Sequence, residues 1–320
     1  MTRECFVGFD TSNYTTSAAV CTKEGDVIAN IKSPLPVKEG ECGLRQSDAV
    51  FAHVKNLPEV VGSLREAIKG YRVLAVGCST QPRNLKDSYM PCFLAGRVAA
   101  ESFAAALDIP VIETAHQDGH IMAAAYSSGA MDKLLKEPFC AFHVSGGTTE
   151  VLHVTPKEDG FSVSLIGGTQ DLNAGQAIDR VGVMMGLQFP CGREMEALAK
   201  EWQGKIPAPR ICVREGYCNL SGLQNLAEKL WKESGDKSLV SAYVFSFVGK
   251  TLAKMTEAID EKYGNIPVVY AGGVMSNQGL QMLLAKRSNT YFAAPQFSAD
   301  NAAGVALICR KRYFGNAEDQ

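Results

Sequence analysis

Apolar positions along the chain form short strand-like runs and longer helix-like repeats. The short runs lie at residues 5–9, 17–21, 139–144 and 151–154. The first and third runs each stop at a loop of small polar residues before the next run begins. Each half of the chain therefore predicts a strand, a polar loop and a hairpin in the same order.

Apolar residues at helical spacing follow these strands in each half. They predict helices at residues 54–68, 93–107, 239–263 and around 176–187, with further helices from about residue 279 and from residue 300. Short apolar runs predict buried strands at residues 73–76, 110–112 and 267–271. The polar stretch 204–219 predicts an exposed excursion. This alternation of strands and helices indicates an α/β fold.

A sheet domain present twice, each copy with a small-residue loop between its first two strands, resembles the duplicated actin-like ATPase and sugar-kinase (ASKHA) fold. That resemblance implies two domains around a nucleotide cleft. The first domain would be residues 1–125, completed by a C-terminal helix at 300–320, and the second would be residues 126–299. Two unrelated hairpins with glycine turns give the same local pattern, so the pattern alone leaves both interpretations open.

Composition excludes several classes of protein. Hydrophobic residues at 46% and charged residues at 21% exclude a disordered chain. The formal net charge of −2 gives no global positive field, so nucleic acid would need a local basic patch. The Arg-Lys-Arg run at 310–312 is a candidate, with a solvated helix end as the alternative. No apolar run approaches the ~20 residues of a membrane span and no signal peptide follows Arg3, so we expect a cytoplasmic protein without a membrane partner.

The ten cysteines contain no Cys-x-x-Cys pair and predict small buried side chains in a reducing compartment. Cys212 and Cys218 are the only pair that might meet, and a zinc or redox role there has little support.

His116 and His120 are candidate metal ligands. If their segment is helical, both imidazoles leave the same face one turn apart, which suits one ion. A polar helix start in which they cap or hydrogen-bond is the alternative. Gln117 stands where a zinc peptidase of the His-Glu-x-x-His type has its general base, which disfavours that class.

Asp300 is the candidate third ligand. Its place at the start of the last predicted helix is equally explained by an N-cap role. Two imidazoles and one carboxylate bind Fe(II) or Zn(II) with positions left open for substrate, and the sequence does not choose between these metals.

Three segments have the composition of a nucleotide site. The stretch 145–149, Ser-Gly-Gly-Thr-Thr, offers unshielded backbone N–H groups and hydroxyls for a phosphate, with a β-turn as the alternative. Gly272 and Gly273 after a strand would let a base or ribose approach, and Asn277 could read a hydroxyl, although an ordinary strand-to-helix turn fits equally well. The Asp179 carboxylate suits a ribose diol or a solvated helix position.

These elements occur together in the order of one family. The chain resembles the TsaD/Gcp/Qri-type family, the tRNA N6-adenosine threonylcarbamoyltransferases. The resemblance runs nearly end to end and rests on the motifs Gly8-Phe-Asp-Thr-Ser12, His116-x-x-x-His120, Val144-Ser-Gly-Gly147, Gly175-x-Ala-x-Asp179, Phe189-Pro-Cys-Gly192, Leu220-Ser-Gly-Leu223, Gly272-Gly-Val-x-x-Asn277 and Asp300-Asn301.

The resemblance implies transfer of a threonylcarbamoyl group from threonylcarbamoyl-AMP to N6 of adenosine 37 in tRNA. It implies that His116, His120 and Asp300 hold one divalent metal ion, and that Asp10 and Ser12 serve catalysis. It also implies an adenine nucleotide or acyl adenylate bound by Val144, Ser145, Gly146, Gly147, Thr148, Asp179, Gly192 and Asn277. The expected partners are tRNA and TsaB-like and TsaE-like proteins.

Several positions depart from the family. Tyr14 and Thr15 occupy two acidic positions of the first loop, and Thr148 replaces a histidine. Residues 81–84 read Gln-Pro-Arg-Asn in place of Gly-Pro-Gly-Leu, and a Pro-Glu pair is absent near residues 46–47. These departures indicate a divergent paralogue and leave two alternatives open: a carbamoyl-adenylate-dependent carbamoyltransferase with another acceptor, or a non-catalytic nucleotide-binding scaffold of a t6A-type complex.

Overall fold

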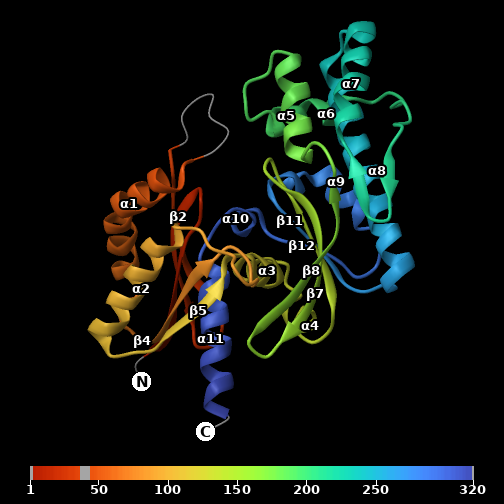
Figure 1. The fold of residues 1–320 in the computed structure, drawn as a ribbon. Coiled ribbons are helices and arrows are strands. Elements are labelled where there is room, and N and C mark those ends of the chain that lie inside the picture. Colours follow the sequence, from red (N-terminus) through yellow and green to blue (C-terminus); the bar gives the residue numbers. More distant parts are fainter. Residues whose placement is uncertain (1–2, 37–43, 319–320) are drawn as a thin grey trace. The chain divides into compact units, whose positions relative to one another are not determined.

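The computed structural model describes residues 3–36 and 44–318. Contacts divide the chain into two units (Figure 1). Unit 1 comprises Met1–Ser127, Lys157–Phe161 and Phe297–Gln320, and unit 2 comprises Ser128–Pro156 and Ser162–Gln296. Each unit has its own sheet and its own apolar core.

Unit 1 is built on a five-stranded sheet in the order β3-β2-β1-β4-β5. Its strands are β1 (Arg3–Thr11), β2 (Thr15–Thr22), β3 (Val27–Pro34), β4 (Tyr71–Gln81) and β5 (Val111–Ala115). Strand β1 pairs antiparallel with β2 and parallel with β4. Its helices are α1 (Gln46–Ala67), α2 (Phe93–Leu107), α3 (His116–Ser127) and α11 (Ala303–Glu318), and α10 (Pro295–Ser298) joins the units in sequence.

Strand β1 places alternate side chains on opposite faces of this sheet. Val7 and Phe9 belong to an apolar core with residues of α1 and α2. Phe6 points the other way and contacts the Tyr313 ring of α11 at 5.3 Å between centroids. By the same alternation Asp10 lies on the α11 face, where its carboxylate meets α3. The β1 backbone therefore decides which side of the sheet receives the charged group.

Helix α11 packs backbone to backbone against α3 and β1. A Cβ built at Gly304 would lie 1.8 Å from the carbonyl oxygen of Gly119 in α3. A Cβ built at Gly8 would lie 2.5 Å from the backbone nitrogen of Ala306. Only glycine allows this approach, and it holds the start of α11 against the start of α3.

Unit 2 contains a seven-stranded sheet in the order β12-β11-β6-β7-β8-β10-β9. Its strands are β6 (Phe139–Val144), β7 (Thr149–Lys157), β8 (Gly160–Thr169), β9 (Cys212–Arg214), β10 (Tyr217–Asn219), β11 (Val268–Ala271) and β12 (Thr290–Phe292). Its helices are α4 (Met131–Leu134), α5 (Ala174–Met184), α6 (Gly192–Glu201), α7 (Ser221–Ser234), α8 (Lys237–Tyr263), the 3₁₀ helix η1 (Gly273–Ser276) and α9 (Gln278–Leu284). Strand β6 pairs antiparallel with β7 and parallel with β11, which repeats the pairing of β1 with β2 and β4.

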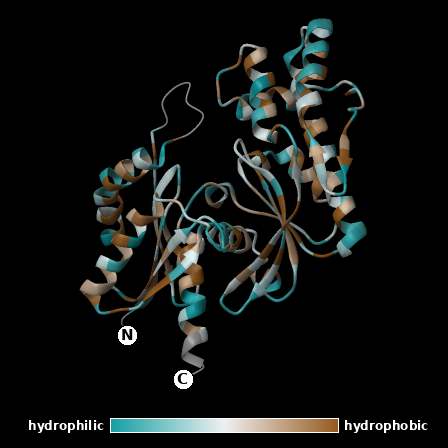
Figure 2. Cartoon of the chain, viewed as in Figure 1, coloured by the Kyte–Doolittle hydropathy of each residue, from teal (hydrophilic) through white to brown (hydrophobic). Residues whose placement is uncertain are grey.

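Alternating apolar positions build the core of unit 2. Cys140, Phe142 and Val144 of β6 face the same cluster as α5 and the long helix α8. The Phe142 ring lies 4.6 Å from the Tyr270 ring of β11. In Figure 2 brown and teal segments alternate along the helices of unit 2, as expected for helices with one buried side.

Three sequence predictions need correction. Helix α1 begins at Gln46, well before residue 54, and includes Pro58. The last helix begins at Ala303 and not at residue 300. The stretch 204–219 is not wholly an exposed excursion, because part of it forms β9 and β10 at the edge of the sheet, with Cys218 buried.

The cysteines behave largely as predicted. Among the described residues every cysteine is a free thiol, and all but Cys212 are buried. Cys212 is paired across the hairpin with Asn219, while Cys218 is paired with Val213. Cys42 lies outside the described residues.

The basic run at 310–312 is tied to unit 1. Each of its three side chains donates a hydrogen bond to a backbone carbonyl oxygen, those of Lys23, Lys157 and Glu113 in turn. These contacts favour a role in holding α11. In the part of the chain that the structure describes, no helix has both the length and the apolarity to cross a bilayer.

The packing of α11 predicts that an added methyl group destabilises the protein at one position of this helix and not at another. Gly304→Ala should lower the free energy of unfolding by about 2 kcal/mol or more, because the new Cβ overlaps the Gly119 carbonyl. Gly315→Ala in the same helix is the control, since its Cβ would meet nothing within 4 Å. The control should be neutral or stabilising by up to ~1 kcal/mol. Urea denaturation of both variants measures this, and equal effects would contradict the packing argument.

Candidate functional site

Three side chains of unit 1 bring their donor atoms together. His116 and His120 lie in the first turns of α3, and Asp300 lies just before α11. The two Nε2 atoms are 3.0 Å apart. The Asp300 Oδ1 atom is 3.1 Å from His120 Nε2 and 3.7 Å from His116 Nε2. Within residues 3–36 and 44–318, no other three His, Cys, Asp or Glu side chains form such a group.

These distances fit a single metal ion. Zinc and similar ions bind nitrogen and oxygen at about 2.0–2.2 Å, so neighbouring ligand atoms lie about 3–3.5 Å apart. Two imidazole nitrogens and one carboxylate oxygen suit Fe(II) or Zn(II). The donor set and its spacing can therefore hold the ion that the sequence implies.

Asp300 is not the N-cap of α11. The Oδ1 atom of Asn301 accepts from the backbone nitrogen of Ala303 at 3.1 Å, so Asn301 caps the helix. The Nδ2 atom of Asn301 also donates to the carbonyl oxygens of Phe297 and Ala299. Asn301 thus fixes the short segment that carries Asp300 and leaves the Asp300 carboxylate to the histidines.

Asp10 orients His116 by contacting Nδ1, the ring nitrogen that does not face the other two candidate ligands. Its two carboxylate oxygens lie 2.9 and 3.0 Å from His116 Nδ1. Because a carboxylate accepts, Nδ1 donates to Asp10, and this hydrogen bond directs Nε2 toward His120 and Asp300. Asp10 is fully buried, at 0% exposed, and also accepts from the Ser79 hydroxyl. It therefore acts through His116 and does not touch a substrate.

The electrostatics of the group favour a cation. Burial works against a charged His116, but the carboxylates of Asp10 and Asp300 outweigh it and raise the pKa of His116 to about 9. Burial would raise the pKa of Asp300, yet the hydrogen bond from His120 and the two imidazoles hold it well below its usual range. The group thus retains protons that a bound divalent ion would replace.

Ser12 and His53 complete the surroundings of Asp300. The Ser12 hydroxyl donates to Asp300 Oδ2 at 2.5 Å. His53 of α1 lies 2.7 Å from the Ser12 carbonyl oxygen through Nε2 and 2.8 Å from the Thr16 hydroxyl through Nδ1. Burial lowers the pKa of His53, so it is a neutral donor that locks the β1–β2 loop. We did not predict His53 or Ser79 from the sequence, because buried polar residues of this kind carry no local signal.

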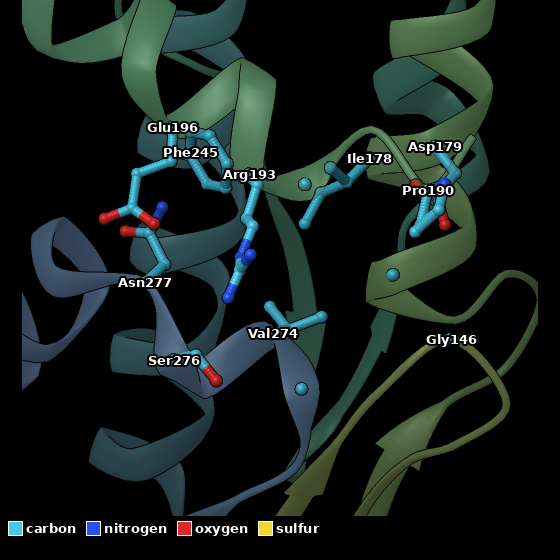
Figure 3. Close-up of a pocket in the computed structure, with 13 residues that line it drawn as sticks. Gly146, Ile178, Asp179, Pro190, Arg193, Glu196, Phe245, Val274, Ser276 and Asn277 are labelled. Atoms are coloured by element: carbon cyan, nitrogen blue, oxygen red, sulfur yellow. The ribbon is translucent and has the colours of Figure 1, made fainter. Parts of the chain in front are cut away.

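The residues predicted to bind a nucleotide lie in unit 2. A pocket of about 350 Å³ is lined by Gly146, Gly175, Ile178, Asp179, Pro190, Gly192, Arg193, Glu196, Phe245, Gly273, Val274, Ser276 and Asn277 (Figure 3). In Figure 3 Arg193 extends from its helix toward Val274, and Asp179 and Pro190 lie close together. We did not predict Arg193, Glu196 or Phe245 in this pocket from the sequence, because only the folding of the chain brings α6 and α8 to it.

Hydrogen bonds fix two of the predicted pocket residues. Asp179 Oδ1 accepts from the backbone nitrogen of Cys191 at 2.8 Å. Burial raises the pKa of Asp179, and this N–H group opposes the rise. Asn277 Oδ1 accepts from Leu280 at 2.9 Å and caps α9, which leaves the side-chain amide nitrogen as a donor beside the pocket.

Of the stretch predicted to bind phosphate, only Gly146 lines the pocket. Val144 is buried in the core, and the backbone nitrogen of Ser145 donates to the Thr148 carbonyl at 2.7 Å. A Cβ at Gly175 would lie 2.7 Å from Gly146, so the start of α5 rests directly on this turn. Gly147, whose carbonyl accepts from Asn173, is not among the lining residues.

Comparison with known proteins relates the chain to one family. The model of the family "TsaD: tRNA N6-adenosine threonylcarbamoyltransferase" matches residues 89–307, which include all three candidate metal ligands. A tRNA N6-adenosine threonylcarbamoyltransferase of Streptococcus sanguinis is 33% identical over 291 residues, covering 87% of this chain and 82% of that protein. The protein of the same name from Streptococcus thermophilus strain LMD-9 is 28% identical over 95% of this chain and 91% of its own.

Solved structures share the fold at low sequence identity. The activator of 2-hydroxyisocaproyl-CoA dehydratase from Clostridium difficile, with bound ADPNP, gives a TM-score of 0.55 at 13% identity and covers 99% of this chain and 98% of its own. A glucokinase of the ROK family from Streptomyces griseus gives 0.51 at 14% identity, covering 95% of this chain and 98% of that chain. These likenesses confirm the predicted α/β fold of actin-like ATPases and sugar kinases.

The first site prediction concerns the ligands themselves. We expect His116→Ala with His120→Ala to remove most bound metal, because a single carboxylate holds an ion poorly. His153→Ala, a histidine of unit 2 stacked on Tyr263, is the matched control. Elemental analysis of the purified proteins measures the metal. Equal metal content in the double variant and in the wild type would show that the group is not a metal site.

The second site prediction concerns the carboxylate behind His116. Asp10→Asn keeps the shape of the side chain but removes its charge, so metal affinity should fall about 10- to 100-fold while the fold is retained. Ser17→Ala is the control, because the Ser17 hydroxyl binds only the backbone oxygen of Asp10. Titration of the metal-free proteins with Zn(II) compares them, and an unchanged affinity in Asp10→Asn would refute the positioning role.

Proposed function

The chain belongs to the tRNA N6-adenosine threonylcarbamoyltransferase family, and we propose that it transfers a threonylcarbamoyl group from threonylcarbamoyl-AMP to N6 of adenosine 37 in tRNA. The observation that carries the proposal is the group of His116, His120 and Asp300 backed by a buried Asp10. Unit 2 of the same chain holds a pocket suited to the nucleotide.

The metal group would act on the acyl donor. One divalent ion, Fe(II) or Zn(II), would supply Lewis-acid polarisation of the carbamoyl carbonyl. His116, His120 and Asp300 would hold it, and Asp10 is a positioning residue that keeps the proton on His116 Nδ1. Ser12 holds the second oxygen of Asp300, so that Oδ1 remains directed at the histidines.

The pocket of unit 2 would bind the adenylate part of the donor. Asp179 offers a carboxylate for the ribose diol, and Asn277 offers an amide nitrogen. Gly146 and Gly192 present backbone without side chains, which permits close approach of ribose or phosphate. Arg193 supplies a positive charge for the nucleotide.

The transfer balances without an oxidant or a further reactant. N6 of the adenosine forms a bond to the carbamoyl carbon. The bond between that carbon and the phosphate oxygen of the adenylate breaks, and AMP leaves. The proton lost by N6 passes to solvent. The side chains of this chain would need only to hold the donor and the ion that polarises its carbonyl.

A reconstituted reaction tests the proposal. It contains the full chain, threonine, bicarbonate, ATP, an enzyme that makes threonylcarbamoyl-AMP, TsaB-like and TsaE-like proteins, and unmodified tRNA. We expect threonylcarbamoyladenosine in the digested tRNA by mass spectrometry, and none when guanosine replaces adenosine 37. The double variant His116→Ala, His120→Ala should lose the product yet bind ADP as tightly as the wild type, because the pocket lies in the other unit.

Two outcomes would overturn the proposal. Carbamoylation of a small molecule in place of tRNA would identify a carbamoyltransferase with another acceptor. Nucleotide binding without any product, at every enzyme concentration and with both partner proteins present, would identify a non-catalytic scaffold.

A further inference from the structure

Unit 2 has a second hollow that shares Asp179 with the nucleotide pocket. This groove, of about 460 Å³, is lined by Gln176, Asp179, Arg180 and Val183 of α5, by Phe189, and by Gln224 of α7. Five of these six side chains can hydrogen-bond or stack on a flat ring. The proposed transfer leaves the groove without a role.

Phe189 is the unusual member of the groove. Its side chain is 74% exposed, although a large aromatic ring gains free energy from burial. The segment that carries it is firmly anchored, because the next residue but one, Cys191, is fully buried and its backbone nitrogen binds Asp179. A Cβ at Gly182 would lie 2.3 Å from Cys191 Cβ, so this anchor packs tightly against α5. The backbone close to the exposed ring is thus fixed, and the ring lines the groove.

The polar lining favours a nucleobase. Amide side chains such as Gln176 and Gln224 can pair with the donors and acceptors on a base edge. The Oε1 atom of Gln176 already accepts from Asn173 at 3.3 Å, which orients its amide nitrogen as a donor. The formal charges of Asp179 and Arg180, which both line the groove, cancel, so the groove has no net positive charge for the RNA backbone and its amides and ring suit a base. An apolar peptide helix would leave these polar groups without partners.

We propose that the groove binds one unstacked nucleobase of the RNA substrate, with its face on Phe189 and its edge on Gln176 and Gln224. The identity of the RNA as tRNA rests on the proposed function. Stacking on Phe189 tolerates any base, so any preference among bases comes from the edge contacts with Gln176 and Gln224. Arg180, which also lines the groove, can stack on a neighbouring base.

Removal of the ring tests the contact. Phe189→Ala should weaken binding of unmodified tRNA about 5- to 150-fold, as expected for the loss of one stacked base. Phe51→Ala is the matched control, because Phe51 is 66% exposed on α1 of unit 1. The control should bind tRNA like the wild type, and both variants should bind ADP unchanged. A fully paired RNA duplex should show no difference between the variants, since its bases are already stacked.

A spectroscopic measurement distinguishes stacking from a structural effect. The emission of Phe189→Trp should be quenched by tRNA and not by the duplex, whereas Phe51→Trp should not respond to either. Phe189→Trp should also retain tRNA affinity, because an indole stacks as well as a phenyl ring.

The outcomes separate this inference from the proposed function. If the wild type modifies tRNA but Phe189→Ala binds it equally well, the groove proposal is wrong and the function stands. If RNA binding depends on Phe189 but no modified adenosine forms, the groove proposal stands and the function is wrong. Unchanged RNA affinity together with lost binding of the TsaB-like or TsaE-like protein would make the groove a protein-docking surface and overturn the proposal. If the wild type binds no tRNA, both proposals are wrong.

Discussion

The candidate metal group of His116, His120 and Asp300 depends on the contact of two helix backbones, at Gly304 in α11 and Gly119 in α3. His116 and His120 flank Gly119, and Asp300 comes four residues before Gly304, so this one contact brings the three side chains to the same place. The approach has no room for a methyl group, which means that neither helix can shift toward the other. The packed backbones hold the two imidazoles and the carboxylate together before any ion binds. Because these side chains need no further ordering, the packing offsets the free-energy cost of bringing them together.

The packing of α3 and α11 also buries a charged side chain, that of Asp10. Asp10 is on the α11 face of β1 because strand residues alternate, and this face is closed by α3 and α11. A buried carboxylate is costly unless it is fully paired, and here Ser79 and His116 satisfy it. The same pairing fixes which nitrogen of His116 carries the proton. One buried group therefore both stabilises the packed loop and prepares a ligand, and its removal would affect the two together.

Much of the fold could be predicted from the sequence, since apolar periodicity marked most strands and helices and the two loops marked the repeat. The start of α1 was missed because its apolar residues do not repeat along one buried face, Phe51 and Val54 being exposed, and β9 and β10 were missed because such short strands have little apolar pattern. The spacing of His116 and His120 placed both on one helix face. Pattern alone did not show that Asn301 would cap α11 in place of Asp300, because both residues are good caps. His53, Ser79, Arg193 and Phe245 join their sites through tertiary packing, which no local pattern encodes.

Three of the departures from the family motifs, Tyr14, Thr15 and Thr148, lie outside the two candidate binding sites. Tyr14 has an exposed side chain, and Thr15 contributes a backbone oxygen that the Ser12 hydroxyl also reaches, at 3.5 Å. Thr148 closes a turn with Ser145 through backbone and hydroxyl bonds, at a position where the nucleotide pocket needs only the Gly146 backbone. None of the three therefore holds the candidate ion or lines the pocket. Changes at these positions therefore leave unaltered the residues that would hold the ion and the residues that line the nucleotide pocket.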